Sequence, residues 1–311
     1  MKIGITMGDP AGIGPEITLK AINRIEKKDS GKYVIIGAKD ILKSVKKNCN
    51  IKWDGEIINC VTVYPEYIKY GKISVTAGNA AYKYIIKGYD LIKEKKINAL
   101  VTAPICKASI KLAGFDYPGH TELLAELSNT KRFAMMLAGT ETAKNKKPLR
   151  VTLVTTHIPI KEVSSSLTKK TILEKIELTQ EFLVNNFGIK QPNIGVCALN
   201  PHSDEFGEEE KNFIRPAVER AKSYGINVSG PYPADTLFTK PGFDAIVAMY
   251  HDQGLIPLKL KEFGNAVNIT LGLPFVRTSP DHGTAFDIAG KWVADPGSMI
   301  NAIKMAEKLA K

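Results

Sequence analysis

The sequence predicts an α/β fold built on mostly parallel strands. Short runs rich in β-branched residues alternate with amphipathic segments along most of the 311 residues, and this alternation is typical of a parallel sheet covered by helices. Several strand-like runs are apolar throughout rather than at every second position, as expected for strands that are buried on both faces. The composition is that of a globular protein, with 44% hydrophobic and 24% charged residues.

The expected elements follow one another in a regular order along the chain. Strands are expected at 2–7, 33–37, 56–63, 98–102, 150–155, 193–199 and 243–250. Helices are expected at 15–28, 77–95, 120–128, 168–187, 208–224 and 296–309. Pro15 suits a first helical turn, because its missing N–H would have no partner there. Gly188 and Gly225 directly follow two of these helices, where C-terminal caps favour glycine. The segment KNKKP at 144–148 is expected to be an exposed turn.

The charge of the chain raises the question of nucleic-acid binding. The formal net charge is +11, but only six of the 43 basic residues are arginines. Arginine is the preferred residue for bidentate base and phosphate recognition, whereas scattered lysine mainly keeps a surface hydrated. The lysine clusters lie far apart in the sequence, and no aromatic residues alternate with them as stacking platforms. We therefore expect a lysine-rich surface that attracts anionic substrates, and no nucleic-acid partner.

The sequence also argues against a membrane or a secreted location. No apolar run approaches the roughly 18 residues of a membrane span, and the first residues, MKIGITMGDPAGIGPE, are too polar for a signal peptide. The four cysteines show no CxxC spacing, which argues against a zinc knuckle or a redox pair. A cytoplasmic protein without a membrane partner is expected.

The five histidines carry the clearest functional signal. Each stands in a short motif rich in glycine, proline or small polar residues, namely PGHTE, TTHIP, NPHSDE, YHDQG and DHGTA. His157, His202 and His251 directly follow expected strands, and ligands of α/β proteins gather at the carboxyl ends of strands. Three imidazoles with one open position are typical of a catalytic metal site. Spacing alone favours neither a metal site nor histidines that only make hydrogen bonds.

Three further features indicate a binding site. Arg277, in LGLPFVRTSPDHGT, can bind a carboxylate or a phosphate with its forked guanidinium. The small residues of HGTAFDIAGK at 282–291 allow a backbone to approach a flat or phosphorylated ligand closely. The segment GDPAGIGPE at 8–16 lacks the GxGxxG spacing and is not expected to be a dinucleotide fingerprint.

These motifs together resemble those of the 4-hydroxythreonine-4-phosphate dehydrogenase family of pyridoxal phosphate (pyridoxine) biosynthesis. The match covers essentially the whole chain, through MGDPAGIGPE, GHTELLAE, THIP, NPH, GPYPADTLF, YHDQGLIPLK and NITLGLPFVRTSPDHGTAFDIAGK. The resemblance implies an isocitrate/isopropylmalate dehydrogenase-like fold, with two α/β/α domains and a cleft between them. It also implies a homodimer with active sites at the subunit interface. We expect one domain from 1–122 with 265–311, on the dinucleotide side, and a second from 123–264, on the metal and dimer side.

The resemblance also implies roles for individual residues. The three ligands of a divalent metal ion are matched by His157, His202 and His251. The substrate-binding positions are matched by His120, Thr121, Lys259, Asn268 and Arg277. The segment HGTAFDIAGK resembles the part of this fold that receives the adenosine side of NAD. Its cofactor-binding candidates are His282, Gly283, Thr284, Ala285 and Asp287.

The implied activity is an oxidation followed by a decarboxylation. NAD and a divalent metal ion would oxidise 4-phosphohydroxy-L-threonine to a β-keto acid, which loses CO2 to give 3-amino-2-oxopropyl phosphate. The sequence leaves open whether the metal is zinc, magnesium, cobalt or manganese, and whether NADP replaces NAD. It does not identify the general base. Asp235 and Asp252 are candidates for orienting a ligand or relaying a proton, and equally for capping a helix or a turn.

The loop after the second metal histidine departs from the family pattern. The family sequence is close to NPHAGEGG, whereas this chain has NPHSDEFGEEE in a loop that is shorter by about three residues. It keeps Pro201, His202 and Glu205 but loses the glycines on either side of Glu205. A reshaped loop leaves the substrate open, and the alternative is a non-amino four-carbon acid such as erythronate or threonate 4-phosphate. A more distant alternative is a three-histidine metal hydrolase, which gives no role to HGTAFDIAGK or Arg277.

Overall fold

The chain forms two compact units. The structure is a computed structural model that describes residues 1–25, 31–141 and 147–310. The first unit combines Met1–Lys131 with Leu273–Lys311, and the second is Arg132–Gly272. Both boundaries lie later in the chain than the expected 122/123 and 264/265, because helix α5 packs on α3 of the first unit and strand β10 pairs with β5 of the second. The end of the first expected helix and most of the turn expected at 144–148 lie outside the described residues.

The first unit contains a parallel sheet with the order β3-β2-β1-β4-β11. Its strands are β1 (Ile3–Thr6), β2 (Tyr33–Gly37), β3 (Glu56–Asn59), β4 (Ala99–Thr102) and β11 (Val276–Pro280). All of them except the edge strand β3 are buried along their whole length. The continuous apolar runs in the sequence are therefore explained by burial on both faces.

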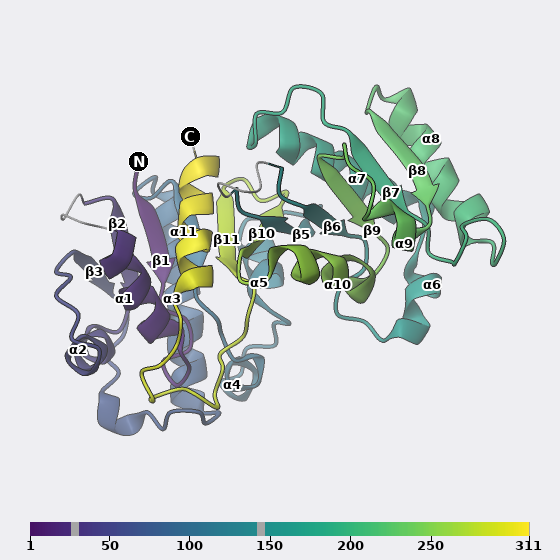
Figure 1. Ribbon diagram of the computed structural model, residues 1–311. Helices are drawn as coiled ribbons and strands as arrows, with labels where there is room; N and C mark the ends of the chain where they lie inside the picture. Colours follow the sequence, from purple (N-terminus) through teal and green to yellow (C-terminus); the bar gives the residue numbers. More distant parts are fainter. Residues whose placement is uncertain (26–30, 142–146, 311) are drawn as a thin grey trace. The chain divides into compact units, whose positions relative to one another are not determined.

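Helices cover both faces of this sheet. They are α1 (Gly14–Ile25), α2 (Lys39–Asn48), α3 (Val75–Lys93), α4 (Lys107–Leu112), α5 (His120–Leu127) and α11 (Gly297–Leu309). Helices α1 and α11 pack against each other on one face, and α3 lies on the opposite face (Figure 1). Pro15 lies in the first turn of α1, as expected.

The second unit contains a mixed sheet with the order β10-β5-β6-β9-β7-β8. Its strands are β5 (Ala134–Gly139), β6 (Arg150–Leu153), β7 (Ile194–Cys197), β8 (Val228–Tyr232), β9 (Ala245–Ala248) and β10 (Ala266–Leu271). Strand β5 runs antiparallel to both β10 and β6, whereas β6, β9, β7 and β8 are mutually parallel. The three strands expected at 150–155, 193–199 and 243–250 are thus confirmed and adjacent.

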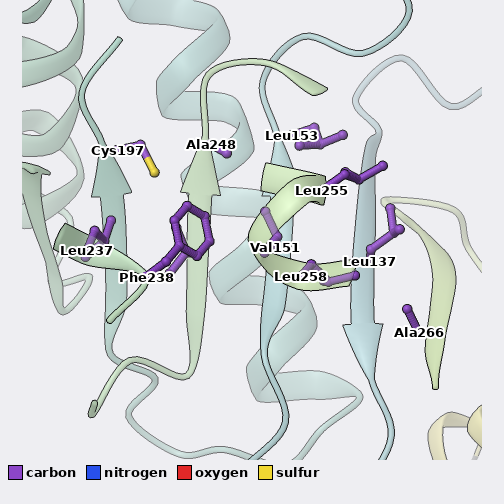
Figure 2. Close-up of a cluster of buried hydrophobic side chains, with 11 residues drawn as sticks. Leu137, Val151, Leu153, Cys197, Leu237, Phe238, Ala248, Leu255, Leu258 and Ala266 are labelled. Atoms are coloured by element: carbon purple, nitrogen blue, oxygen red, sulfur yellow. The ribbon is translucent and has the colours of Figure 1, made fainter. Parts of the chain in front are cut away.

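Two faces of this second sheet are covered by different helices. Helix α7 (Lys169–Asn185) packs with α8 (Arg215–Ser223) on one face, and α10 (His251–Glu262) covers the other (Figures 1 and 2). Short helices α6 (Val163–Ser166) and α9 (Ala234–Leu237) lie in the connections, and a π-helical turn, Glu210–Ile214, leads into α8. Among the described residues, no helix has the length and apolar character that crossing a bilayer requires.

Helix α10 was not expected from the sequence. Its stretch contains Gly254 and Pro257, which both disfavour a helix interior. Packing outweighs this preference, because Leu255 and Leu258 on its inner face join the buried cluster that Figure 2 shows between α10 and the strands. Cys197 lies in the same cluster and is fully buried.

Candidate active site

Strands β6, β7 and β9 of the second unit bring the three candidate metal ligands to one edge of its sheet. The three strands are parallel neighbours, so their carboxyl ends share that edge. His157 follows β6, His202 follows β7, and His251 is the first residue of α10 directly after β9. The topological argument from the sequence therefore places all three histidines at the end of the sheet where α/β proteins bind ligands.

Two of these histidines lie close to each other. The ring centres of His157 and His251 are 5.9 Å apart. Two imidazoles on one tetrahedral ion, with metal–nitrogen distances of roughly 2 Å, have ring centres roughly 5 Å apart. His251 also donates its Nδ1–H to Asp252 Oδ1 over 2.7 Å, which leaves Nε2 as the nitrogen that could bind a metal ion. This donor set fits a divalent transition metal.

His202 stands apart from this pair. It is exposed, its φ is +58°, and the next residue, Ser203, has a φ of +63°. Its ring packs near the Phe206 ring, 6.1 Å away between centres, and its Nδ1 lies 3.8 Å from Glu205 Oε2. No set of three His, Cys, Asp or Glu side chains within the described ranges is close enough to enclose an ion. The structure thus brings together two of the three expected ligands.

The shortened loop that carries His202 is anchored by two acidic residues from its own sequence. The buried Glu210 carboxylate accepts hydrogen bonds from the backbone N–H groups of Leu199 and Asn200, both at 2.8 Å. The Asn200 side-chain amide donates to Glu210 and to Glu209, at 2.9 and 2.8 Å. These contacts fix the start of the loop firmly, and they give the last two glutamates of NPHSDEFGEEE a structural role.

Two hollows with polar linings open at this edge of the second unit. A cavity of about 610 Å³ is lined by His202, Asp235, Tyr250 and Asp252 among others. A smaller one, of about 260 Å³, lies between His157 and His251 and shares Tyr250 and Asp252 with the first. Asp235 therefore faces the larger cavity, although its Oδ1 also accepts the Thr236 N–H over 2.8 Å as a local turn residue.

The two remaining candidates of the second unit differ in their surroundings. Asn268 lies on β10, and its buried Oδ1 has no hydrogen-bond partner in the part of the chain that the structure describes. Lys259 lies on α10 and is exposed, beside a hollow of about 400 Å³ that is otherwise lined by His251, Asp252, Leu255, Ile256, Leu260 and Phe263. The unpaired amide oxygen of Asn268 is consistent with a ligand-binding position, because buried polar atoms normally have partners.

In the first unit, the buried Arg277 and the partly buried His120 form a polar group. Arg277 is 2% exposed, and its Nε and Nη2 donate to Thr102 Oγ1 over 3.1 and 2.6 Å. Burial lowers the pKa of Arg277 to about 10, and Glu122 partly opposes this shift. His120 begins α5, and its buried Nε2 has no hydrogen-bond partner among the described residues. Burial, together with the positive charges of Arg277 and Lys107, holds the pKa of His120 well below its usual value.

This group has the electrostatics of an anion site. A buried guanidinium is disfavoured by the loss of water and regains stability when an anion binds beside it. His120 is neutral at physiological pH, so its unpaired Nε2 either accepts or donates a single hydrogen bond, depending on its tautomer. Thr121 follows His120 at the buried start of α5. Three of the five expected substrate-binding residues, His120, Thr121 and Arg277, therefore belong to this part of the first unit.

The cofactor-binding candidates lie in an irregular segment of the same unit. Thr284 accepts a hydrogen bond from the Ile13 N–H over 3.0 Å, so the segment is fixed against the turn that precedes α1. His282 is exposed, and a Cβ added at Gly283 would meet no atom within 4 Å. Ala285 has a φ of +44°. The space beside the Gly283 backbone is therefore open, and no contact with the described residues requires a glycine at this position.

Sequence reasoning missed several residues that the site uses. Thr102 ends β4 and holds the Arg277 guanidinium, and Glu210 holds the loop before His202. Gln253 binds backbone groups at the ends of two strands. The only available signal was position, because Thr102 and Gln253 lie at or just beyond the carboxyl ends of expected strands.

Comparisons with known proteins agree on one family. Residues 8–306 match the family model described as pyridoxal phosphate biosynthetic protein PdxA. The chain is 45% identical to the 4-hydroxythreonine-4-phosphate dehydrogenase of Sulfurihydrogenibium sp., over 98% of this chain and 97% of that one. It is 40% identical to the D-threonate 4-phosphate dehydrogenase of Cupriavidus necator, over 99% and 97%.

Solved structures support the same assignment and the fold. The 4-hydroxythreonine-4-phosphate dehydrogenase of Klebsiella pneumoniae has a TM-score of 0.86 and 38% identity, covering 100% of this chain and 99% of that chain. The isocitrate dehydrogenase of Methylococcus capsulatus shares only 17% identity, with a TM-score of 0.52 over 99% and 85% of the two chains, and so bears on the fold alone. The expected isocitrate dehydrogenase-like α/β fold is confirmed, and the chain belongs to the PdxA family of dehydrogenases.

Proposed function

We propose that this dehydrogenase oxidises 4-phosphohydroxy-L-threonine, with NAD and a divalent metal ion, to a β-keto acid that decarboxylates to 3-amino-2-oxopropyl phosphate. The observation that carries the proposal is the pair of histidines at the carboxyl edge of the second sheet, with ring centres 5.9 Å apart and Asp252 on the outer nitrogen of His251. Relatives named for this substrate, which align with the chain over nearly their full length, support it further.

The metal would be held by His157 and His251, with His202 as the third ligand. Zinc, magnesium, cobalt or manganese bound there would act as a Lewis acid toward the substrate hydroxyl and toward the negative charge that develops on decarboxylation. The contribution of the chain is to fix the two imidazoles, and Asp252 orients His251 by accepting its Nδ1–H.

The substrate anions would be bound by charged and unpaired groups. Arg277, His120 and Thr121 provide a buried cation and a neutral imidazole for a phosphate or a carboxylate. Lys259 provides a further cation, and the buried amide oxygen of Asn268 can accept a hydrogen bond from a substrate hydroxyl or ammonium group. A bound anion would offset the desolvation cost of the buried Arg277 charge. This gain would contribute part of the binding free energy of the anion.

The dinucleotide would bind along the segment from His282 to Asp287. NAD, or NADP in its place, supplies the acceptor of the hydride. The open space beside Gly283 allows the backbone to approach a flat or phosphorylated ligand. Asp235 and Asp252 line the larger cavity of the second unit and remain the carboxylates placed to orient groups there.

We also propose that the protein acts as a homodimer through the exposed face of α10. Ile256, Leu260 and Phe263 are 60%, 82% and 85% exposed, and they line one hollow together with His251. Exposed apolar side chains gathered on one element are typical of an interaction surface. Because α10 begins at the metal ligand His251, a second copy on this face would lie directly beside the active site.

A second candidate substrate is D-threonate 4-phosphate, which lacks the amine. Two observations favour it: a relative of nearly the same identity is named for that activity, and the loop after His202 is shorter than the family pattern and held by Glu209 and Glu210. Both substrates carry the same phosphate and hydroxy acid, so the metal and anion sites described above serve either one.

A substrate panel separates the two candidates. NADH formation is measured with 4-phosphohydroxy-L-threonine, D-threonate 4-phosphate and erythronate 4-phosphate, each with saturating NAD and divalent metal. We expect kcat/KM to be at least about tenfold higher with the amino substrate, a difference of about 1.4 kcal/mol. A preference for either non-amino acid would assign the chain to the second activity.

A further inference from the structure

The side chain of Gln253 lies between two strands at the point where they separate. Strands β7 and β9 pair in register from Ile194 with Ala245 to Val196 with Val247. In the same register Ala198 would face Met249, but these two backbones are bridged by a side chain. Gln253 Oε1 accepts the Met249 N–H over 2.7 Å, and its Nε2 donates to the Ala198 carbonyl over 2.7 Å.

The amide of Gln253 therefore replaces one peptide group of the ladder. A side-chain amide has the same donor and acceptor as a peptide bond and can extend a hydrogen-bonded pattern across a wider gap. The wider gap is part of the cavity of about 610 Å³, which Ala198, Tyr250 and Gln253 help to line. The crevice at the strand ends thus depends on this inserted amide.

Thr155 completes the connection on the other side of Met249. Its backbone N–H donates to the Met249 carbonyl over 3.1 Å, and its hydroxyl donates to the same oxygen over 2.7 Å. Met249 is fully buried, so both of its backbone polar groups need these partners. The ends of β6, β9 and β7 are consequently joined through Thr155, Met249, Gln253 and Ala198 in one chain of hydrogen bonds.

Each joined position stands shortly before one of the candidate metal ligands. His157 follows Thr155, His251 follows Met249, and His202 follows Ala198, each within a few residues. A shift of one strand end would therefore move a histidine directly. Partners beyond the ligands themselves commonly change metal affinity by about 10- to 100-fold when they are removed.

We propose that Gln253, assisted by Thr155, is a positioning residue that sets the spacing of the three histidine-bearing strand ends and thereby the affinity for the metal ion. This inference rests on the proposed metal site. Within the described ranges the Gln253 side chain binds only backbone groups, with both ends of its amide occupied. Its effect is therefore transmitted through the strands, with no direct contact to the metal.

The test compares Co²⁺ binding by three variants and the wild type. Gln253→Met keeps the length of the side chain and removes both hydrogen bonds, and Thr155→Val removes only the hydroxyl. The matched control is Gln180→Met on α7 of the same unit, where the Gln180 Oε1 has no hydrogen-bond partner to lose. Visible absorption of Co²⁺ reports its ligands, and competition with a chelator gives its Kd.

Gln253→Met is expected to weaken Co²⁺ binding at least about tenfold and to change the Co²⁺ spectrum. Thr155→Val should weaken it less, because the backbone N–H of Thr155 still reaches Met249. The Gln180→Met control should bind as the wild type does. Hydrogen exchange at the Met249 amide should be faster in Gln253→Met, which shows independently of the metal that the connection is lost.

Wild-type Co²⁺ affinity and spectrum in Gln253→Met would overturn the inference while leaving the metal site intact. A wild-type protein without nitrogen-ligated Co²⁺ would overturn the proposed metal function, and this inference with it. If Gln253→Met does not fold, Thr155→Val decides: an unchanged Kd and spectrum in that folded variant would contradict the proposed connection.

Discussion

Replacing Arg277 by methionine should stabilise the ligand-free protein while removing its response to phosphate. Arg277 is almost completely buried, and burial lowers its pKa from 12.5 to about 10. Since one pKa unit corresponds to about 1.4 kcal/mol, keeping this side chain charged costs roughly 3 kcal/mol of folding free energy. The pKa of this cation is depressed, so the cost is fully present below the folded pKa and fades as pH rises from there to the unfolded value.

The loss of the two hydrogen bonds to Thr102 offsets part of that gain. Each such bond contributes on the order of 1 kcal/mol, so Arg277→Met should raise the free energy of unfolding by roughly 1 to 2 kcal/mol at neutral pH. The wild type should be stabilised by inorganic phosphate, by about 2.7 kcal/mol at a hundred times its Kd. The variant should show no such stabilisation.

Urea unfolding at neutral pH, with and without phosphate, measures both effects. The control is Arg24→Met in the same unit, since Arg24 is 60% exposed and only 3.9 Å from an exposed Asp295 oxygen. That variant should unfold as the wild type does and respond equally to phosphate. A destabilised Arg277→Met, or one that phosphate stabilises as much as it stabilises the wild type, would refute the reasoning.

Three further variants test other parts of the account. Leu260→Asp should weaken dimerisation by about 4 kcal/mol, or roughly a thousandfold in Kd. The reason is that a symmetric interface contains two copies of this side chain, and burying each one contributes about 2 kcal/mol. Analytical ultracentrifugation that finds a monomeric wild type, or an equally dimeric variant, would contradict the proposed interface. His251→Ala should bind no divalent metal tightly and lose turnover while keeping its circular dichroism spectrum, and near-normal activity would disprove its role as a ligand. Asp9→Asn tests a carboxyl group whose pKa burial raises, despite the opposing hydrogen bond from the Ala11 N–H. The wild type should lose stability as pH rises from the ordinary Asp range through this raised pKa, so the variant should be the more stable protein in urea unfolding at neutral pH and should lose this advantage in acid. Equal pH profiles of the two proteins would contradict the burial argument.

Local sequence patterns were sufficient where burial decides the structure. The expected strands at 2–7, 33–37 and 98–102 are β1, β2 and β4, whose apolar runs are buried throughout. The pairing of β10 with β5 was not predicted, because antiparallel pairing between segments so distant in the chain leaves no local signal. Helix α10 was missed because Gly254 and Pro257 argue against it and only tertiary packing favours it.

In the candidate site, too, some features could be predicted from local sequence and others depend on tertiary structure. Position after a strand was enough to place His157, His202 and His251 on one edge of the sheet. It could not predict that His202 would stand apart, because this follows from two consecutive left-handed residues and from the Glu210 contacts of a loop with its own sequence. The partners Thr102 and Gln253 depend on strand register, which a single sequence does not contain.

The most direct test of the central claim is NADH formation by the purified protein with 4-phosphohydroxy-L-threonine, NAD and a divalent metal ion, before and after chelation and after return of the metal. The account predicts turnover that stops on chelation and resumes when the metal is restored. Turnover that is unaffected by complete metal removal, or the absence of NADH with this substrate and with erythronate and threonate 4-phosphates, would contradict it.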